Sequence, residues 1–489
     1  MVRRRLTPFG TRSPGYARSW VPTLVVTLIA GLLRLVNLGA PPGKIFDETY
    51  YATEAHALLR YGVEWNEAEN TASYVVHPPL GKWLIAAGEM LFGYDEFGWR
   101  VSAAVAGTLS VLLLVRVARR MLRSTVLGCA AGLLLAVDGY HLVLSRTALL
   151  DIFLMLFLLA AFAALLRDRD TRRSGLLAAR EAGRDRPARA VRWWLLAAAA
   201  LLGAAAGVKW SALFFAPAFA LLVVWWDAGL RRTAGDPRPW RRAVLRDGLA
   251  WLPWCLLLVA AVYLATWSGW FLTDVGYFRH WRAGQGLSEP PVVGALLNLA
   301  HYHREALSFH SGLSTQHTYQ SWPWQWLLLG RPVAFYWSGD VPCGADQCAA
   351  EVLLLGTPVL WWAFLPALLA TAWLGVARRD WRAGAVWVGA AAGILPWFWY
   401  AAQGRTMFSF YALPALPFLV LAVCYVLGAL VGRRNGGDSA AARATAIGIA
   451  AGYVLLVAAC FAWYYPLFVG TSIPYDEWQS RILLGNRWI

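Results

Sequence analysis

Residues 408–431, FSFYALPALPFLVLAVCYVLGALV, form an apolar stretch without a single charged residue. It is long enough for an α-helix to cross the hydrocarbon core of a bilayer, which takes about 20 residues. The whole chain has the same bias: 59% of its 489 residues are hydrophobic and only 15% are charged, against about 25% charged residues in soluble domains. The sequence therefore predicts an all-α polytopic membrane protein and excludes a soluble enzyme, a disordered chain and a fibrous protein.

Eleven windows of this kind follow one another along the chain. They are predicted at 20–39, 97–116, 125–141, 147–166, 192–208, 210–228, 248–270, 352–376, 383–400, 408–431 and 444–469. If the N-terminus is cytoplasmic, the inner segments hold 30 of the 44 Lys and Arg residues, which is the positive-inside bias of membrane proteins. This bias accounts for the net charge of +16 and argues against nucleic-acid binding. It also predicts an extracytoplasmic C-terminus.

The windows divide the chain into five expected parts. These are a cytoplasmic N-terminal segment (1–19), an N-terminal catalytic membrane module (20–270), a large extracytoplasmic loop (271–350), a C-terminal membrane module (351–469) and an extracytoplasmic tail (470–489). All eight histidines fall at or beyond the outer face, and nine acidic residues lie between residues 40 and 97. We therefore expect the active site to open to the non-cytoplasmic face.

Two adjacent carboxylates stand in the first outer loop, in the sequence Phe46-Asp47-Glu48-Thr49. Neighbouring side chains point to different sides of a regular backbone, so one can act on a substrate while the other contacts a partner. The alternative is that one of them caps the helix that follows. Arg34, inside the first span, favours a functional site, because an intramembrane arginine normally faces a polar cavity or a partner acid.

The next motif of this loop is His77-Pro78-Pro79-Leu80-Gly81-Lys82. Its prolines predict an extended entry into the apolar run Leu80–Phe92. That run is short for a span, and we expect it to lie along the membrane interface. Lys82 near the headgroups would suit the phosphate of a lipid. The alternative is an interfacial lysine that only extends its amine to water.

Charged residues also mark the outer ends of neighbouring spans. Arg100, Asp138, Arg146 and Asp151 are all expected there and together predict a charged vestibule. For Arg100 and Asp151, a salt-bridge network that only holds helices together is the alternative.

Residues 308–321, SFHSGLSTQHTYQS, are dense in hydrogen-bonding side chains. Such a segment suits the hydroxyls of a sugar and the oxygens of a phosphate, although a solvated loop is the alternative. A metal site that joins His301 and His303 to His310 or His317 is a weaker interpretation.

The same large loop holds an aromatic cluster and two cysteines. The cluster, Trp322–Trp326, is typical of anchors at a membrane interface and can also form a platform for a sugar. Cys343 and Cys348 lie outside the cytoplasm, where oxidation is permitted, and a local disulfide is expected.

Taken together, these motifs resemble the protein O-mannosyltransferases of the GT-C glycosyltransferase superfamily, over nearly the whole chain. The resemblance is carried by Asp47 and Glu48, by HPPLGK at 77–82, by Trp99–Ala103, by Ser145 and Arg146 with Asp151, and by a Pro-Trp-x-Trp motif followed by Arg331. Eukaryotic members carry a β-trefoil MIR domain in the large outer loop. Residues 271–350 leave no room for one, so the resemblance is to the compact bacterial type.

The resemblance implies the GT-C fold and an inverting transfer of mannose from polyprenyl-phosphate mannose to Ser/Thr hydroxyls of exported proteins. It makes Asp47 the general base, and Glu48 the residue that orients the acceptor backbone or a neighbouring cation. The residues expected around the phosphate and the sugar are His77, Lys82, Arg146, His310, Gln316, His317, Tyr319 and Arg331. No metal or other cofactor is implied.

The resemblance also implies a place in the bacterial plasma membrane, with acceptors that emerge from the secretion machinery. Two alternatives remain open. One is another GT-C transferase, which would move a pentose or aminosugar from a polyprenyl phosphate to a glycolipid or polysaccharide. The other is a flippase for lipid-linked sugars, which would need polar residues through the membrane midplane.

Overall fold

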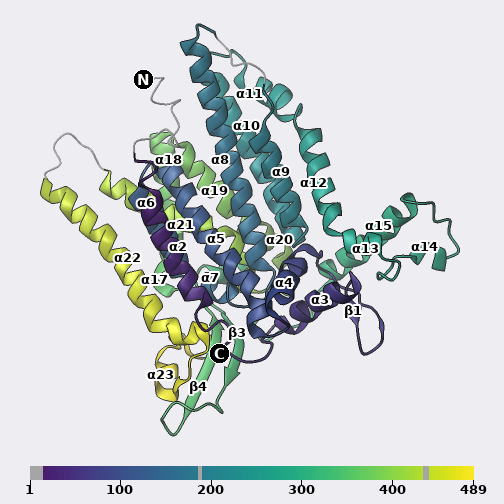
Figure 1. Ribbon diagram of the computed structural model, residues 1–489. Helices are drawn as coiled ribbons and strands as arrows, with labels where there is room; N and C mark the ends of the chain where they lie inside the picture. The colour runs from purple at the N-terminus through teal and green to yellow at the C-terminus, as the bar shows by residue number, and fades with distance from the viewer. Residues whose placement is uncertain (1–14, 185–189, 433–439, 489) are drawn as a thin grey trace.

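The computed structural model describes residues 15–184, 190–432 and 440–488, and Figure 1 shows them as a bundle of helices with smaller elements gathered at one end. In this described part, six helical segments are long and apolar enough to cross a membrane. They are α5 (Glu96–Leu122), η1 with α10 (Trp210–Thr233), α17 with α18 (Pro358–Arg378), α19 with α20 (Trp381–Ala402), η3 with α21 (Ser409–Val431) and α22 (Ala440–Val469). The chain is thus a multi-pass membrane protein.

Helices also lie at the remaining expected spans, but none of them is by itself both long enough and apolar enough to be counted as a membrane crossing. Pro239–Gly248 and α12 (Leu252–Thr266) would make a seventh span as a pair bent by 42°. Shorter apolar helices are α2 (Trp20–Leu35), α6 (Thr125–Ala136) and α9 (Trp193–Ala206). A further helix, α8 (Asp151–Glu181), is apolar in its first half and rich in arginine in its second. A helix therefore lies at each expected position, but the count of eleven crossings is not confirmed.

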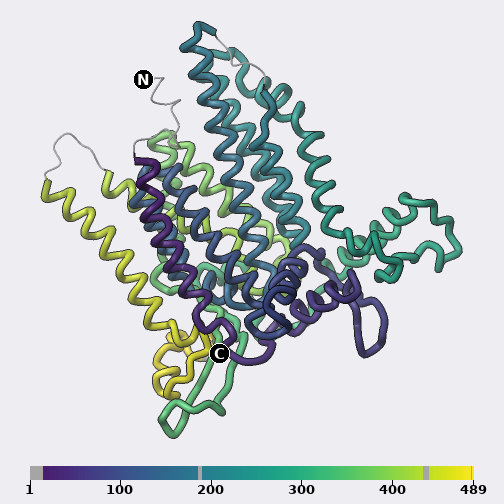
Figure 2. Tube along the Cα trace, viewed as in Figure 1, coloured from purple at the N-terminus to yellow at the C-terminus, as the bar shows by residue number. Residues whose placement is uncertain are grey.

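The two outer loops meet at the lower end of the bundle in Figure 1. Figure 2 shows that α2 and α22, at opposite ends of the colour scale, both run from the upper end to this lower end. The first loop supplies α3 (Glu48–Tyr61), the short strands β1 (Trp65–Asn66) and β2 (Thr71–Ala72), and α4 (Leu80–Phe92). The second supplies α13 (Ser268–Leu272), α14 (Trp281–Gly284), α15 (Val293–Gly312), α16 (Pro323–Trp326), β3 (Val333–Ser338) and β4 (Cys348–Leu354).

The helix α4 has the bounds of the apolar run read from the sequence, but it packs into the protein. Gly81 and Gly88 allow this, because a Cβ at Gly81 would lie 2.7 Å from a methyl group of Leu150, and one at Gly88 would lie 2.4 Å from the carbonyl oxygen of Gly98. Lys82 is consequently buried. The alternative that Lys82 extends its amine to water is wrong, since the side chain is buried and α4 is held between α3 and α5.

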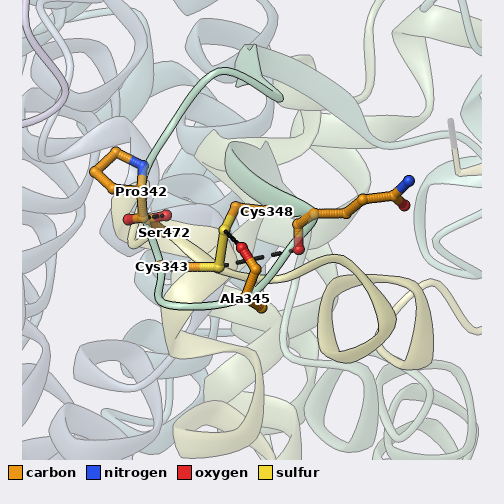
Figure 3. The surroundings of a disulfide bond; sticks show 6 residues. Pro342, Cys343, Ala345, Cys348 and Ser472 are labelled. Carbon is orange, nitrogen blue, oxygen red and sulfur yellow. Dashed lines mark hydrogen bonds between the residues drawn. A yellow bond between two sulfur atoms is a disulfide. The ribbon is translucent and has the colours of Figure 1, made fainter.

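A small antiparallel sheet lies at the lower end in Figure 1, with strand order β3–β4–β5, where β5 is Ile473–Pro474. The expected disulfide between Cys343 and Cys348 is confirmed, and it closes the turn between β3 and β4 (Figure 3). Ser472 Oγ donates to the carbonyl oxygen of Pro342 and attaches this turn to the tail of the chain. The tail continues into α23 (Tyr475–Ser480) and η4 (Gly485–Arg487).

At the opposite end of the bundle, several basic residues are paired with aspartates. Arg192 is buried and contacts both Asp168 and Asp227, and Arg172 links Asp227 to Asp247. These ion pairs join α8 to α10 and to the residues before α12, so part of the arginine charge at this end is compensated within the protein.

Candidate active site

Glu48 and Arg100 form a completely buried ion pair where the first outer loop meets α5. Arg100 Nε and Nη2 each lie 2.8 Å from a different carboxylate oxygen of Glu48. The backbone N–H groups of Ile45 and Ala148 donate to the same two oxygens, at 3.0 and 2.9 Å. Arg100 also donates to the carbonyl oxygens of Leu38, Pro41 and Gly43. Glu48 thus orients a cation and holds the start of α3, and no oxygen of its carboxylate is left for a substrate.

Asp47 stands next to this pair, but its carboxylate is not used by the fold. Asp47 occupies the N-cap position of α3, yet its side chain makes no capping hydrogen bond. Within the described ranges, no hydrogen bond to this carboxylate is present, and the side chain is half-buried. The capping alternative for Asp47 is therefore wrong, and a carboxylate with free oxygens remains at the start of α3.

The surroundings of Asp47 combine a cation and a second acid. Lys209 follows α9, and its Nζ lies 2.7 Å from Oδ2 of Asp151, the first residue of α8. Burial raises the pKa of Asp47 to about 6, Lys209 acts in the opposite direction, and Asp151 adds to the increase. A carboxylate with this pKa is ionised at neutral pH and is a stronger base than an ordinary aspartate.

Beside Lys209 lies a group of cationic and imidazole side chains. The rings of His77 and His310 are 5.2 Å apart, and His310 Nε2 lies 3.0 Å from the carbonyl oxygen of Val76. Arg405 Nε donates to the carbonyl oxygen of His310. The pKa of His77 is lowered well below its usual value by burial first, and then by the charges of neighbours that include Lys209 and Arg405. Such a positive environment suits an anionic group of a substrate.

The structure brings together only part of the predicted site. Lys82 is not in the group around Lys209: it is buried between the carboxylates of Glu64 and Glu54, with Nζ 3.3 Å from Glu54. The two acids neutralise its charge, so the predicted contact with a phosphate is not supported by this geometry.

Arg146 caps the C-terminal end of α2. Its guanidinium donates to the carbonyl oxygens of Leu33, Arg34, Val36 and Asn37, at 2.7–3.3 Å. These carbonyls have no partner within the helix, and a cation there also complements the helix dipole. Arg146 therefore has a structural role here, and the predicted contact with the donor phosphate is not supported.

Arg34 has no acid among its hydrogen-bond partners. It is fully buried, its Nη2 lies 2.6 Å from Nδ1 of His141, and its Nη1 donates to the carbonyl oxygen of Ala30. Asp138, the acid expected nearby, instead accepts from the N–H of His141 and from the indole of Trp361. The expected vestibule is thus largely a buried polar network that joins helices, apart from Asp151 and its contact with Lys209.

The other predicted sugar and phosphate residues lie farther along the second outer loop. Gln316 and His317 are exposed, and the ring of His317 packs 5.0 Å from Phe408. Arg331 lies 5.5 Å from the ring of Tyr319 and donates to backbone carbonyl oxygens. No described contact joins these residues to Asp47 directly.

Two residues of the cluster, Lys209 and Arg405, were not identified from the sequence. Each is an isolated charge between two closely spaced apolar windows, 192–208 and 210–228 for Lys209, and 383–400 and 408–431 for Arg405. A charge at such a position is costly and commonly functional, and this signal could have identified both.

The weak metal interpretation finds no support in the ranges 15–184, 190–432 and 440–488. Within them, no three His, Cys, Asp or Glu side chains gather as metal ligands would. His301 stacks on Trp281, with ring centroids 3.7 Å apart, and His303 Nε2 lies 2.5 Å from the hydroxyl of Tyr263.

Two family models match consecutive parts of the chain. The model described as dolichyl-phosphate-mannose-protein mannosyltransferase matches residues 24–281, and the model of the C-terminal four TMM region of protein-O-mannosyltransferase matches residues 296–488. The chain is 42% identical over 489 residues to the polyprenol-phosphate-mannose–protein mannosyltransferase of Mycolicibacterium smegmatis, which covers 96% of this chain and 93% of that protein. A Corynebacterium glutamicum protein of the same name is 33% identical over 480 residues, which covers 94% of this chain and 92% of that protein.

The fold is also similar to solved structures. The protein O-mannosyltransferase Pmt1-Pmt2 complex of S. cerevisiae, bound to the sugar donor, matches with a TM-score of 0.75 and 15% identity, over 98% of this chain and 93% of that chain. ArnT from Cupriavidus metallidurans bound to undecaprenyl phosphate matches with a TM-score of 0.52 and 17% identity, over 92% and 73% of the two chains. These similarities establish the GT-C fold that was expected.

Replacing Glu48 by glutamine should destabilise the protein, because the buried charge of Arg100 then lacks its counter-ion. The expected loss in the free energy of unfolding is about 3–5 kcal/mol, measured as a lower midpoint of thermal unfolding of the purified protein. Glu67→Gln is the matched control, since Glu67 pairs with Arg60 at the surface and should contribute at most about 1 kcal/mol. Equal midpoints for both variants would contradict the structural role of Glu48.

Proposed function

The chain belongs to the dolichyl-phosphate-mannose-protein mannosyltransferase family, and we propose that it transfers mannose from polyprenyl-phosphate mannose to Ser/Thr hydroxyls of exported proteins. The observation that carries the mechanism is the free carboxylate of Asp47 beside a cationic cluster. Relatives that are 33–42% identical are named for a mannose donor, which favours mannose over a pentose or aminosugar.

In the proposed reaction, Asp47 takes the proton of the acceptor hydroxyl as its oxygen attacks the anomeric carbon of mannose. The bond from that carbon to the phosphate oxygen breaks, and the electron pair leaves with polyprenyl phosphate. Attack on the face opposite the leaving group inverts the anomeric configuration. A phosphate leaves without protonation by a general acid, so a single carboxylate suffices and no cofactor is required.

Lys209 is the best placed cation for the leaving phosphate, with Arg405, His77 and His310 around it. Positive charge that is already in place stabilises the negative charge that develops on the phosphate oxygen in the transition state. Asp151 holds the Lys209 ammonium 2.7 Å away and thereby orients it. The group thus separates two tasks: Asp47 accepts a proton, and Lys209 faces the departing anion.

The orientation that we propose follows from the charge distribution in the sequence. The lower end in Figure 1, with α3 and both large loops, would face the outside of the bacterial plasma membrane, and the arginine-rich end would face the cytoplasm. An exported polypeptide would then reach Asp47 as it emerges from the secretion machinery.

Asp47→Asn should reduce transfer by about two to four orders of magnitude, because an amide cannot accept the proton of the hydroxyl. The measurement is the addition of a hexose to a Ser/Thr-containing peptide, followed by mass spectrometry, with purified protein and polyprenyl-phosphate mannose. Glu69→Gln, an exposed acid of the same loop, should retain normal activity. Near-normal turnover by Asp47→Asn would exclude Asp47 as the base, and no transfer by the unmodified protein would refute the proposed function.

Transfer should also depend on pH with an inflection near the pKa of Asp47, which is about 6. The base must be ionised, so its active fraction is complete well above this pH and falls as the pH decreases through it. Below pH 6 the rate should approach a decrease of about tenfold per pH unit. The residual activity of Asp47→Asn should lack this limb; the same limb in the variant would assign it to another group.

Two buried lysines provide a matched pair of tests for the phosphate. Lys209→Gln should reduce kcat/KM for the donor by about 10- to 150-fold, the equivalent of a charge-assisted hydrogen bond of about 1.5–3 kcal/mol. Lys82→Gln also removes a buried ion pair and should lower thermal stability, but it should leave donor kinetics nearly unchanged in the folded fraction. The reverse pattern would return Lys82 to the phosphate site.

A further inference from the structure

Tyr51 is a buried residue of α3 that the proposed mechanism does not use. It follows Asp47 by one helical turn, and its backbone N–H donates to the carbonyl oxygen of Asp47 at 3.0 Å. Side chains four residues apart are neighbours on the same face of a helix. Tyr51 therefore lies beside the proposed general base.

The hydroxyl of Tyr51 has no partner in the protein. The residue is only 9% exposed, yet within residues 15–184, 190–432 and 440–488 no hydrogen bond of this hydroxyl is present. A buried hydroxyl without a hydrogen bond is costly and calls for an explanation. Phenylalanine would fill the same space without this cost, so packing alone does not explain a tyrosine at this position.

Tyr51 also lies close to the cationic side of the site. Its ring is 6.2 Å from that of His77. Burial raises the pKa of Tyr51 well above its usual value, and negative charge on neighbours that include Asp47 and Asp151 adds to the increase. The phenol is therefore protonated at neutral pH and can donate a hydrogen bond.

The chemistry of the proposed transfer requires the sugar to lie between these two surroundings. Its anomeric carbon must be reached by a hydroxyl whose proton goes to Asp47. The same carbon is bonded to the phosphate oxygen that faces Lys209, and Asp151 holds Lys209. A residue that lies beside both Asp47 and the cationic group is thus next to the sugar ring.

We propose that the Tyr51 hydroxyl donates a hydrogen bond to a hydroxyl group of the donor mannose, an inference that rests on the proposed function. The contact would hold the anomeric carbon of the sugar toward Asp47. A hexose presents several hydroxyl groups, each of which can accept such a bond. The protein itself offers the Tyr51 hydroxyl no acceptor, so the sugar would supply the partner that the fold does not.

The sugar fits better than the phosphate or the acceptor. Phosphate oxygens gain more from the charges of Lys209 and Arg405 than from a neutral phenol. The acceptor hydroxyl attacks from the side opposite the phosphate, whereas Tyr51 lies against His77 on the phosphate side.

The test compares donors that lack single hydroxyl groups of the sugar. Purified full-length protein would receive polyprenyl-phosphate mannose or each of its monodeoxy analogues, together with the same Ser/Thr-containing peptide. Tyr51→Phe should lower kcat/KM for the mannose donor about 2- to 10-fold, as expected for one hydrogen bond between uncharged groups. One deoxy donor should show this loss with the unmodified protein but no further loss with Tyr51→Phe, because the same contact cannot be removed twice.

Tyr50→Phe is the matched control. Tyr50 is the adjacent tyrosine of α3, but it is 64% exposed. This variant should behave like the unmodified protein with every donor. Both variants should keep the thermal midpoint of the unmodified protein, which verifies that they are folded.

Donor binding in the absence of peptide gives a second readout that does not depend on transfer. A bound donor raises the midpoint of thermal unfolding. The deoxy donor identified above should raise it less than the mannose donor in the unmodified protein, and equally in Tyr51→Phe. If this pattern appears but no sugar is transferred, the proposed function is wrong and the Tyr51 contact stands.

Three results would overturn the inference. The first is a Tyr51→Phe protein with unchanged kinetics and unchanged donor binding. The second is a loss by the same factor for the mannose donor and for every deoxy donor, which would show that the hydroxyl contacts none of the sugar hydroxyls. The third is an increase in the KM for the peptide alone, which would assign Tyr51 to the acceptor.

Discussion

The buried ion pair between Glu48 and Arg100 is the interaction on which the junction of α3 and α5 depends. It joins the start of α3 to α5 and also binds the backbone of the turn before α3 through Leu38, Pro41 and Gly43. Burial of two charges is costly, and the cost is offset here because every carboxylate oxygen has two hydrogen-bonding partners. Asp47 is covalently attached to this fixed point and can therefore keep a half-buried, unpaired carboxylate at a defined place.

The chain places two buried lysines, Lys82 and Lys209, in different electrostatic surroundings. Lys82 lies between two acids and is neutralised, whereas Lys209 has one acidic partner and lies among the imidazoles of His77 and His310. The difference matters because an anion gains little from a cation whose charge is already compensated twice. In a membrane protein of this family, a cation that is compensated only once, with the guanidinium of Arg405 nearby and a free carboxylate beside it, is the arrangement that a phosphate leaving group and a hydroxyl nucleophile require together.

Much of the architecture could be predicted from hydropathy. A helix is present at each of the eleven predicted positions, and the ends of α4 coincide with those of the apolar run. The disulfide was also predictable, because two cysteines separated by four residues in one outer loop have few other partners. The number of crossings could not be established in this way, since α2, α6 and α9 are shorter than a full span and α8 continues into a charged half.

The candidate site also has features that the sequence predicts and features that it does not. The sequence by itself determined the fold class, the family and the position of Asp47, because these depend on local composition and on a motif of adjacent residues. Only the tertiary structure decided that Arg146 caps α2, that Lys82 is neutralised by Glu54 and Glu64, and that Lys209 and Arg405 lie with His77 and His310. The physical reason is that the effect of a charge depends on the partners within a few ångströms, and these partners come from segments that are far apart in the chain.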